Sequence, residues 1–260
     1  MKYFLSLFFF LCFATFGFAD EKQITLNWNS FDGIKRLESS QHKNDFYQLV
    51  NYFQPQINPL YCSAASSVMI LNAISGNGKA PSQKDLEVQL PKALGDGKIE
   101  FKSYSQLTFF NEQTDKIKDR KIIDLKNITL ANENDAKNFD PGLTIDELEQ
   151  ILSKVYHLKV KKIYVDKIKP KLINKFREQV KQILVDEDQY LVINFYGKIL
   201  GFGVGHFSPA VAFDEKSDSV LVMDVSGHNR GWYWVEIADL MKAMNTKDGN
   251  HYRGYLIIHK

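Results

Sequence analysis

The sequence predicts an α+β domain in which a helical part packs on an antiparallel sheet. Its first strong apolar block, residues 64–74, has small residues around an apolar centre and is typical of a helix that runs through a protein core. The C-terminal third instead holds short runs rich in valine, isoleucine and aromatic residues, which favour strands. Helices that precede a block of strands are typical of an α+β fold.

The helical part begins with the buried helix. Pro55 and Pro59 cannot continue a helix backwards, so this helix is predicted to begin after them and to end at the turn-forming Asn77-Gly78. Residues 79–138 are charged and weakly periodic, which predicts surface loops and short helices.

Later elements carry clearer signals. Thr144 is followed by acidic residues and predicts the start of a helix over residues 145–158. Leu172, Phe176 and Val180 share one helical face and predict another helix. The predicted strands cover residues 190–195, 209–213, 219–224 and 254–259. The polar segment 214–218 predicts a hairpin connection, and a helix over 237–244 is predicted before the last strand.

The N-terminus has the pattern of an export signal. Lys2 precedes an uncharged apolar run over residues 3–18, and small residues at positions 17 and 19 stand where a signal peptidase reads. The run is shorter than the roughly 20 residues that span a bilayer. We therefore expect a signal peptide over residues 1–19, a mature domain over 20–260 and a periplasmic or secreted destination. A retained anchor is the alternative.

Charge and cysteine content narrow the function. The formal net charge is +2, and removal of Lys2 with the signal lowers it by one. A nucleic-acid partner usually requires a strongly basic surface, so this balance argues against one, and it indicates no membrane partner after cleavage. Cys12 would leave with the signal, which makes Cys62 the single cysteine of the mature chain and excludes an intramolecular disulfide. Such a thiol is either an accident or a reactive group.

Cys62 stands at the predicted first turn of the buried helix, after Tyr61 and before Ser63 and Ala64. A helix N-terminus carries partial positive charge, which favours a reactive thiolate. Gln56 precedes it closely and could form an oxyanion hole together with the Cys62 backbone N–H. The alternative is a structural cysteine with a glutamine in the preceding loop.

His206 and Asp224 complete a candidate triad. His206 follows a glycine-rich segment, 201–205, and precedes a predicted strand, so it can face the helix start and transfer protons. Asp224 ends an apolar run and is expected to accept the Nδ1–H of His206. A lone histidine and a turn-capping aspartate are the alternatives. The order Cys, His, Asp, each at the border of a separate element, favours the triad.

Several motifs carry a family resemblance. The sequence resembles the catalytic domain of phytochelatin synthases over roughly residues 27–260, densely at both ends and thinly between about 79 and 138. The motifs are DFYQLVNYF at 45–53, YCSAAS at 61–66, GHFSP at 205–209, MDVS at 223–226, AMNT at 243–246 and RGY at 253–255.

The resemblance implies a papain-like cysteine protease fold and a glutathione γ-glutamylcysteinyltransferase or glutathione hydrolase. Members cleave the Cys–Gly bond of glutathione, release glycine and hold γ-Glu-Cys as a thioester. Water resolves the thioester to the dipeptide, and a second glutathione resolves it to a phytochelatin. By matching positions, Cys62 would be the nucleophile, His206 the base and acid, Asp224 the orienting carboxylate and Gln56 an oxyanion donor.

Other family positions concern substrate binding. Asp248 and Arg253 match positions that hold the γ-glutamyl group, and one carboxylate with one guanidinium suits a zwitterionic amino-acid end. A pair of solvated turn charges is the alternative. Ser63 stands where the family usually has glycine, and residues 196–198 lack the arginine that usually follows this strand. The cysteine-rich extension of the plant members is absent, so we expect the short bacterial type, in which hydrolysis outweighs chain extension.

No resident metal or cofactor is expected, because one cysteine and scattered histidines lack ligand spacing. A heavy metal such as cadmium would enter as a thiolate complex of the substrate. Glutathione is the expected partner, and the sequence leaves a homodimer open. Two other functions remain open. One is an exported papain-like peptidase for other small peptides, which Asp248 and Arg253 disfavour. The other is a non-catalytic thiol- or metal-binding protein of the periplasm.

Overall fold

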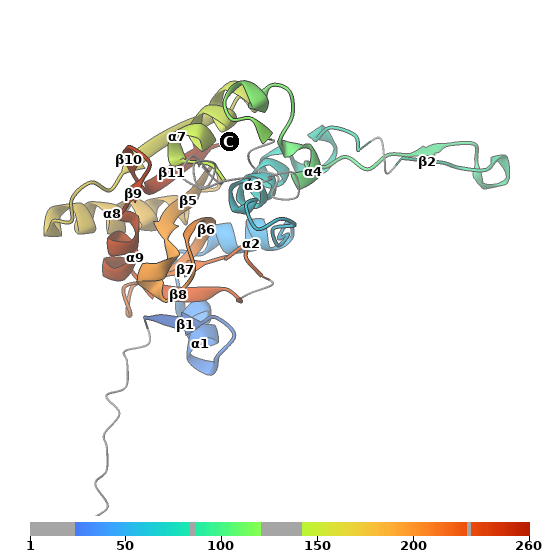
Figure 1. Ribbon diagram of the computed structural model, residues 1–260. Coiled ribbons are helices and arrows are strands. Elements are labelled where there is room, and N and C mark those ends of the chain that lie inside the picture. The colour runs from blue at the N-terminus through green and yellow to red at the C-terminus, as the bar shows by residue number, and fades with distance from the viewer. Residues whose placement is uncertain (1–23, 84–86, 121–141, 228–229) are drawn as a thin grey trace, which may run out of the picture.

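The structure, a computed structural model, describes residues 24–83, 87–120, 142–227 and 230–260. Its centre is a seven-stranded antiparallel sheet, which confirms the predicted α+β class (Figure 1). The strand order across the sheet is β1 (Thr25–Asn27), β8 (Tyr233–Glu236), β7 (Ser219–Val222), β6 (Gly205–Asp214), β5 (Gln189–Tyr196), β11 (Gly254–His259) and β4 (Lys159–Tyr164).

Helices cover both faces of this sheet. One core cluster packs α2 (Asn44–Val50), α3 (Cys62–Lys79) and α7 (Ile145–Gln150) against one face. A second cluster packs α8 (Pro170–Ile183) and α9 (Ile237–Met244) against the other face. Along β5, Tyr190 and Val192 belong to the first cluster, whereas Leu191 and Ile193 belong to the second. Successive side chains of a strand point to opposite faces of the sheet. Because both faces of this sheet are buried, β5 carries apolar residues on both of them.

The four predicted strands are confirmed within the seven-stranded sheet, but the three other strands of this sheet were missed. β1 is very short, β4 alternates lysines with apolar residues, and β8 contains only four residues. β1 and β4 are the two edges of the sheet. Lysines on an edge strand discourage pairing with other chains, but they also weaken the apolar pattern from which a strand is predicted.

The helix predicted over 237–244 is confirmed at both ends as α9, whereas two other helix predictions differ from the structure at their C-terminal ends. α3 begins at Cys62 as predicted, but it continues through Asn77-Gly78 to Lys79. The helix predicted over 145–158 is an α-helix over Ile145–Gln150 followed by a π-helical segment over Ile151–Val155. Its predicted start is confirmed, because the side chains of Thr144 and Glu147 form a reciprocal capping box.

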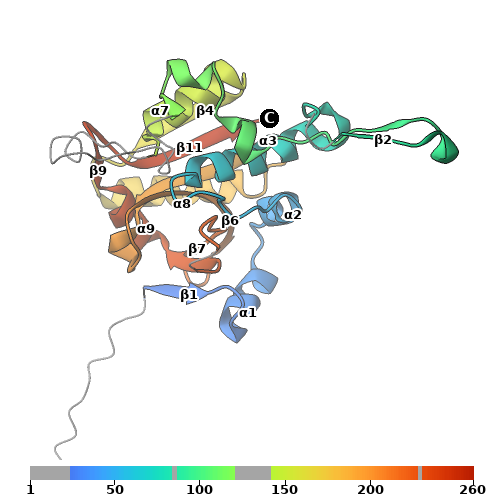
Figure 2. The same ribbon diagram turned by 45° about the vertical axis from the view of Figure 1, so that its right-hand side comes forward.

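The charged region after α3 leaves the body of the molecule. β2 (Val88–Gln89) and β3 (Lys98–Ile99) form a small hairpin that projects outward in both views (Figures 1 and 2). A short helix, α4 (Gln106–Phe109), then returns the chain to α3. Surface loops and short helices were predicted over residues 79–138, so the β2–β3 hairpin was missed, while residues 121–141 lie outside the described part.

The predicted signal peptide, residues 1–19, also lies outside the described residues. Within residues 24–83, 87–120, 142–227 and 230–260, no helix combines the length and apolar character that a bilayer crossing requires.

Candidate active site

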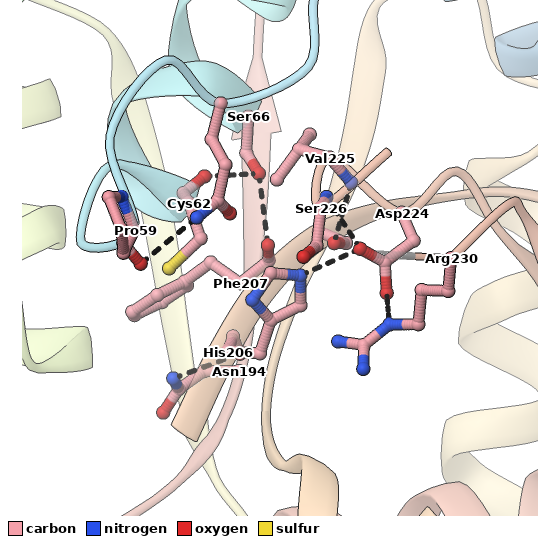
Figure 3. Close-up of polar contacts among 12 residues, drawn as sticks. Pro59, Cys62, Ser66, Asn194, His206, Phe207, Asp224, Val225, Ser226 and Arg230 are labelled. Carbon is pink, nitrogen blue, oxygen red and sulfur yellow. Dashed lines mark hydrogen bonds and ion pairs between the residues drawn. The ribbon is translucent and has the colours of Figure 1, made fainter. Parts of the chain in front are cut away.

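Cys62 is the first residue of α3 and is half-buried. The next residues, Ser63 to Ser66, are fully buried, so the start of the helix is fixed in the core. The Ser66 hydroxyl donates to the Cys62 carbonyl oxygen at 2.8 Å and lies 3.3 Å from the carbonyl oxygen of Phe207 on β6. These contacts hold the helix start beside the strand that carries the histidine (Figure 3).

His206 lies on β6 and faces the start of α3. Its ring is buried and packs edge-to-face on Phe195, with 5.6 Å between the ring centroids. Its Nε2 is 2.9 Å from Oδ1 of Asp224, and Figure 3 shows the ring between that carboxylate and the Cys62 sulfur. The prediction that Nδ1 contacts Asp224 is therefore wrong. The other ring nitrogen, Nδ1, lies on the Cys62 side (Figure 3).

Asp224 lies in the loop after β7 rather than at the end of the strand, because the pairing of β7 stops at Val222. Its side chain is fully buried. Besides His206, the backbone N–H of Ser226 donates to Oδ1 at 2.7 Å, and Nε of Arg230 donates to Oδ2 at 2.7 Å. Burial favours the neutral acid, but the His206 and Arg230 charges outweigh it and lower the pKa of Asp224 to about 2.

The same pair sets the protonation of the histidine. Burial alone would lower the pKa of His206, but the Asp224 carboxylate and the Cys62 side chain raise it to about 9. His206 is therefore an imidazolium at neutral pH in this arrangement, held next to a cysteine sulfur. An imidazolium in this place can donate a proton to the leaving group of a cysteine-dependent reaction.

Gln56 lies on the wall of the site, where its backbone N–H donates to the Val225 carbonyl at 2.8 Å. Its side-chain amide nitrogen donates to the carbonyl oxygens of Asn58 at 3.0 Å and Pro59 at 2.9 Å. To stabilise an oxyanion, this amide must break one of those two hydrogen bonds and donate to the substrate oxygen instead.

A pocket of about 260 Å³ opens beside Cys62 and is called the Cys62 pocket below. Its lining includes the two predicted substrate-binding residues, Asp248 and Arg253, and also Asn194 of β5. Nη2 of Arg253 is 3.0 Å from Oδ1 of Asp248, so the structure brings this pair together with the cysteine. Ser63, which stands in place of the family's usual glycine, does not line the pocket.

Arg253 is fixed in the wall of this pocket. Gly205 leaves the space for it, because a Cβ at position 205 would lie 2.7 Å from Nη2 of Arg253. Nη1 of Arg253 also donates to the Lys247 carbonyl oxygen. Burial lowers the pKa of the guanidinium, and the neighbouring Asp248 charge opposes that shift. Its buried Nε has no hydrogen-bond partner among the described residues.

Two residues of the site were missed from the sequence. Asn194 is a buried amide in an apolar strand, and its Oδ1 has no hydrogen-bond partner within the described part of the chain. A polar residue in the middle of such a strand was a usable signal. Arg230 carried no such signal, because it stands in an irregular loop and its contact with Asp224 exists only in the folded chain.

A metal centre is not apparent in this region. Among the residues that the structure describes, no three histidine, cysteine, aspartate or glutamate side chains group as metal ligands.

A cysteine at the start of a buried helix, opposite a histidine on the sheet and an aspartate in the loop after a neighbouring strand, is the arrangement of a papain-like protein. The family model of phytochelatin synthase matches residues 21–255, and the chain therefore belongs to the phytochelatin synthase family.

Curated relatives agree with this assignment. Glutathione gamma-glutamylcysteinyltransferase 3 of Lotus japonicus is 28% identical over 218 residues, which cover 83% of this chain and 37% of the relative. Glutathione gamma-glutamylcysteinyltransferase 2 of Arabidopsis thaliana is 23% identical over 239 residues, covering 90% and 44% of the two chains. The Schizosaccharomyces pombe glutathione gamma-glutamylcysteinyltransferase is 31% identical over 94 residues, covering 35% and 23%. The chain thus spans less than half the length of these relatives.

Proposed function

We propose that this protein cleaves the Cys–Gly bond of glutathione through a γ-Glu-Cys thioester on Cys62. Glycine is the first product. Water then gives γ-Glu-Cys, and the amine of a second glutathione gives a phytochelatin. Hydrolysis is the main outcome that we propose.

The observation that carries the proposal is the Cys62 pocket. It is lined by the cysteine and by the ion pair of Asp248 and Arg253. It also contains two buried atoms that lack hydrogen-bond partners among the described residues, Nε of Arg253 and Oδ1 of Asn194. One is a donor and the other an acceptor. The α-carboxylate and α-ammonium of a γ-glutamyl group would satisfy both, and unsatisfied buried groups are costly without such a ligand.

The chemistry follows from the order of the side chains. The Cys62 sulfur attacks the carbonyl carbon of the Cys–Gly bond, and His206 donates its proton to the glycine nitrogen as the C–N bond breaks. Asp224 keeps the imidazole in place and stabilises its charged form. In the second half, His206 takes a proton from water or from an amine, and attack on the thioester carbon releases the sulfur.

We further propose that Gln56 stabilises the oxyanion after releasing the carbonyl of Asn58 or Pro59. Loss of one oxyanion donor typically lowers kcat by about 100- to 1,000-fold. No resident metal has a part in this scheme. Cadmium acts in it as part of the substrate, bound to the glutathione thiol.

Export of the enzyme is a separate part of the proposal, and it rests on the sequence of residues 1–19. Fractionation of cells that express the full chain, with N-terminal sequencing of the product, tests it. A product that begins at Asp20 outside the cytoplasm is the expected result. An uncleaved protein in the cytoplasm would contradict it.

Mass spectrometry of protein incubated with glutathione, with and without cadmium, tests the activity. We expect glycine and γ-Glu-Cys from the native protein and neither from Cys62→Ala, because no other described residue replaces the sulfur nucleophile. An isomer of glutathione with an α-linked glutamate serves as the matched substrate control and should be a poor substrate. Absence of glutathione turnover under both conditions, together with cleavage of other peptides, would favour a general peptidase.

A further inference from the structure

A second pocket lies on the other side of the catalytic histidine. It has a volume of about 600 Å³ and is formed by residues 56–59 on one side and by 203–206, Ser226 and Arg230 on the other. We call it the Arg230 pocket. It includes His206 in its lining, whereas the Cys62 pocket includes Cys62, and both share Pro59, Val204 and Gly205. The two pockets therefore meet at the reacting pair.

The position of His206 gives the second pocket a chemical role. If the acyl part of the substrate occupies the Cys62 pocket, the atoms on the far side of the scissile bond extend past His206. They are the leaving amine in the first half of the reaction and the attacking amine in the second. The Arg230 pocket is where the structure leaves room for them.

Arg230 is held in a defined position in this pocket. Its Nε donates to Asp224, and its guanidinium carbon lies 4.0 Å from the centre of the Phe202 ring. For its two terminal nitrogens, no acceptor is recorded among the described residues, and Figure 3 shows this end of the side chain turned away from Asp224. No aspartate or glutamate lines the pocket in the described part of the chain. A fixed guanidinium with unused parallel donors is suited to a carboxylate.

We propose that Arg230 binds the α-carboxylate of the amine component. Glycine carries its amine and its carboxylate on the same carbon, and so does the γ-glutamyl end of an acceptor glutathione. One site can therefore serve both, with the amine at His206 and the carboxylate at Arg230. The inference rests on the proposed function and specifies its amine component as an α-amino acid unit.

The acceptor step is balanced by the groups present. The α-amine attacks the thioester carbon, its proton moves to Nδ1 of His206, the C–N bond forms and the C–S bond breaks. The proton on His206 then accompanies the thiolate of Cys62 as an ion pair. Amines without a neighbouring carboxylate are expected to be poor acceptors.

The test compares glutathione with γ-Glu-Cys-glycinamide, in which the carboxylate is an uncharged amide. A hydrogen bond to a charged group contributes about 1.5 to 3 kcal/mol, so kcat/KM of the native protein should favour glutathione about 10- to 100-fold. In Arg230→Gln this ratio should fall close to one, and in Arg230→Lys it should lie between. Incorporation of labelled glycine into glutathione should decline in Arg230→Gln, whereas incorporation of labelled glycinamide into γ-Glu-Cys-glycinamide should not.

Arg253→Gln is the matched control, because it removes a guanidinium from the other pocket. It should lower turnover of both substrates and keep their ratio. The proposal is overturned if the native ratio is close to one, which requires no variant to fold. It is also overturned if Arg230→Gln lowers both substrates equally, because Arg230 would then act only by positioning Asp224.

Failure of the proposed function gives a different result. If the native protein cleaves neither substrate, that function is wrong, and binding to Cys62→Ala decides the inference. A preference for glutathione over the glycinamide analogue that disappears in Cys62→Ala with Arg230→Gln would support the carboxylate site. Equal affinities in Cys62→Ala would overturn it.

Discussion

Two aspartates in different regions of this protein are equally buried but differ in their hydrogen-bond partners and in the direction of their pKa shifts. Asp224, in the site, and Asp45, in the first turn of α2, each have an exposed fraction of 0%. The carboxylate of Asp224 receives hydrogen bonds from His206, Ser226 and Arg230, and its pKa is lowered to about 2. Neither oxygen of Asp45 has a hydrogen-bond partner among the described residues.

The pKa of Asp45 is raised well above its ordinary value, first by burial and then by the nearby negative charge of Asp186. Burial therefore acts in the same direction on both groups, and the partners decide the sign of the shift. Asp224 is a permanent anion that can orient a protonated histidine. The raised pKa of Asp45 favours the neutral form of its carboxyl group, and this residue belongs to the scaffold.

The largest expected effect is on catalysis. Asp224→Asn should lower kcat for glutathione by about 10⁴-fold, the size known for amide replacement of a triad carboxylate, because the imidazole loses its orienting charge. Steady-state kinetics with a circular-dichroism check of folding would measure it. Asp45→Asn is the matched control and should keep activity close to the native value. Similar losses in both variants would remove the distinction between the two regions.

The second effect concerns the alkaline limit of activity. Because the pKa of His206 is raised to about 9, the imidazolium is lost above that pH, and kcat/KM should fall there. In Asp224→Asn, burial is no longer opposed by the carboxylate, and the limit should move to lower pH. A pH profile of both proteins measures the shift. An unchanged limit in the variant would assign it to another group.

The same raised pKa has a defined sign for stability. Its stabilising contribution is complete below the ordinary histidine pKa of 6.5 and is lost as the pH rises to about 9. For Asp224 the contribution is present above 3.8 and is lost as the pH falls toward 2.

The smallest effect is on stability alone. Between its ordinary pKa of 3.8 and its raised value, Asp45 binds its proton more firmly in the folded state, so stability falls as the pH rises. Asp45→Asn removes this penalty, which is about 1.4 kcal/mol for each pH unit crossed in that interval. Urea unfolding should show a larger gain at pH 7 than at pH 4. Equal gains at both values would mean that Asp45 is already ionised in the fold.

Much of the site could be predicted because its parts stand at local boundaries. Prolines before an apolar block placed Cys62 at a helix start, and a glycine-rich segment before a strand singled out His206. The ring orientation of His206 was predicted wrongly, because which nitrogen faces Asp224 depends on how the loop after β7 packs beside β6. Arg230 was missed because it stands in an irregular loop and its contact with Asp224 follows no helical or strand spacing.

The sequence by itself determined the helix and strand types of the main elements, the position of Cys62 at a helix start and the α+β class, since these depend on apolar periodicity and on local turn chemistry. Only the tertiary structure decided that helices cover both sheet faces, that Asp248 and Arg253 share a pocket with Cys62, and that the pKa of Asp224 is lowered while that of Asp45 is raised. Those outcomes depend on which charged groups meet in a low-dielectric interior. Contacts between residues far apart in the chain are fixed by packing and leave no periodic trace in the sequence.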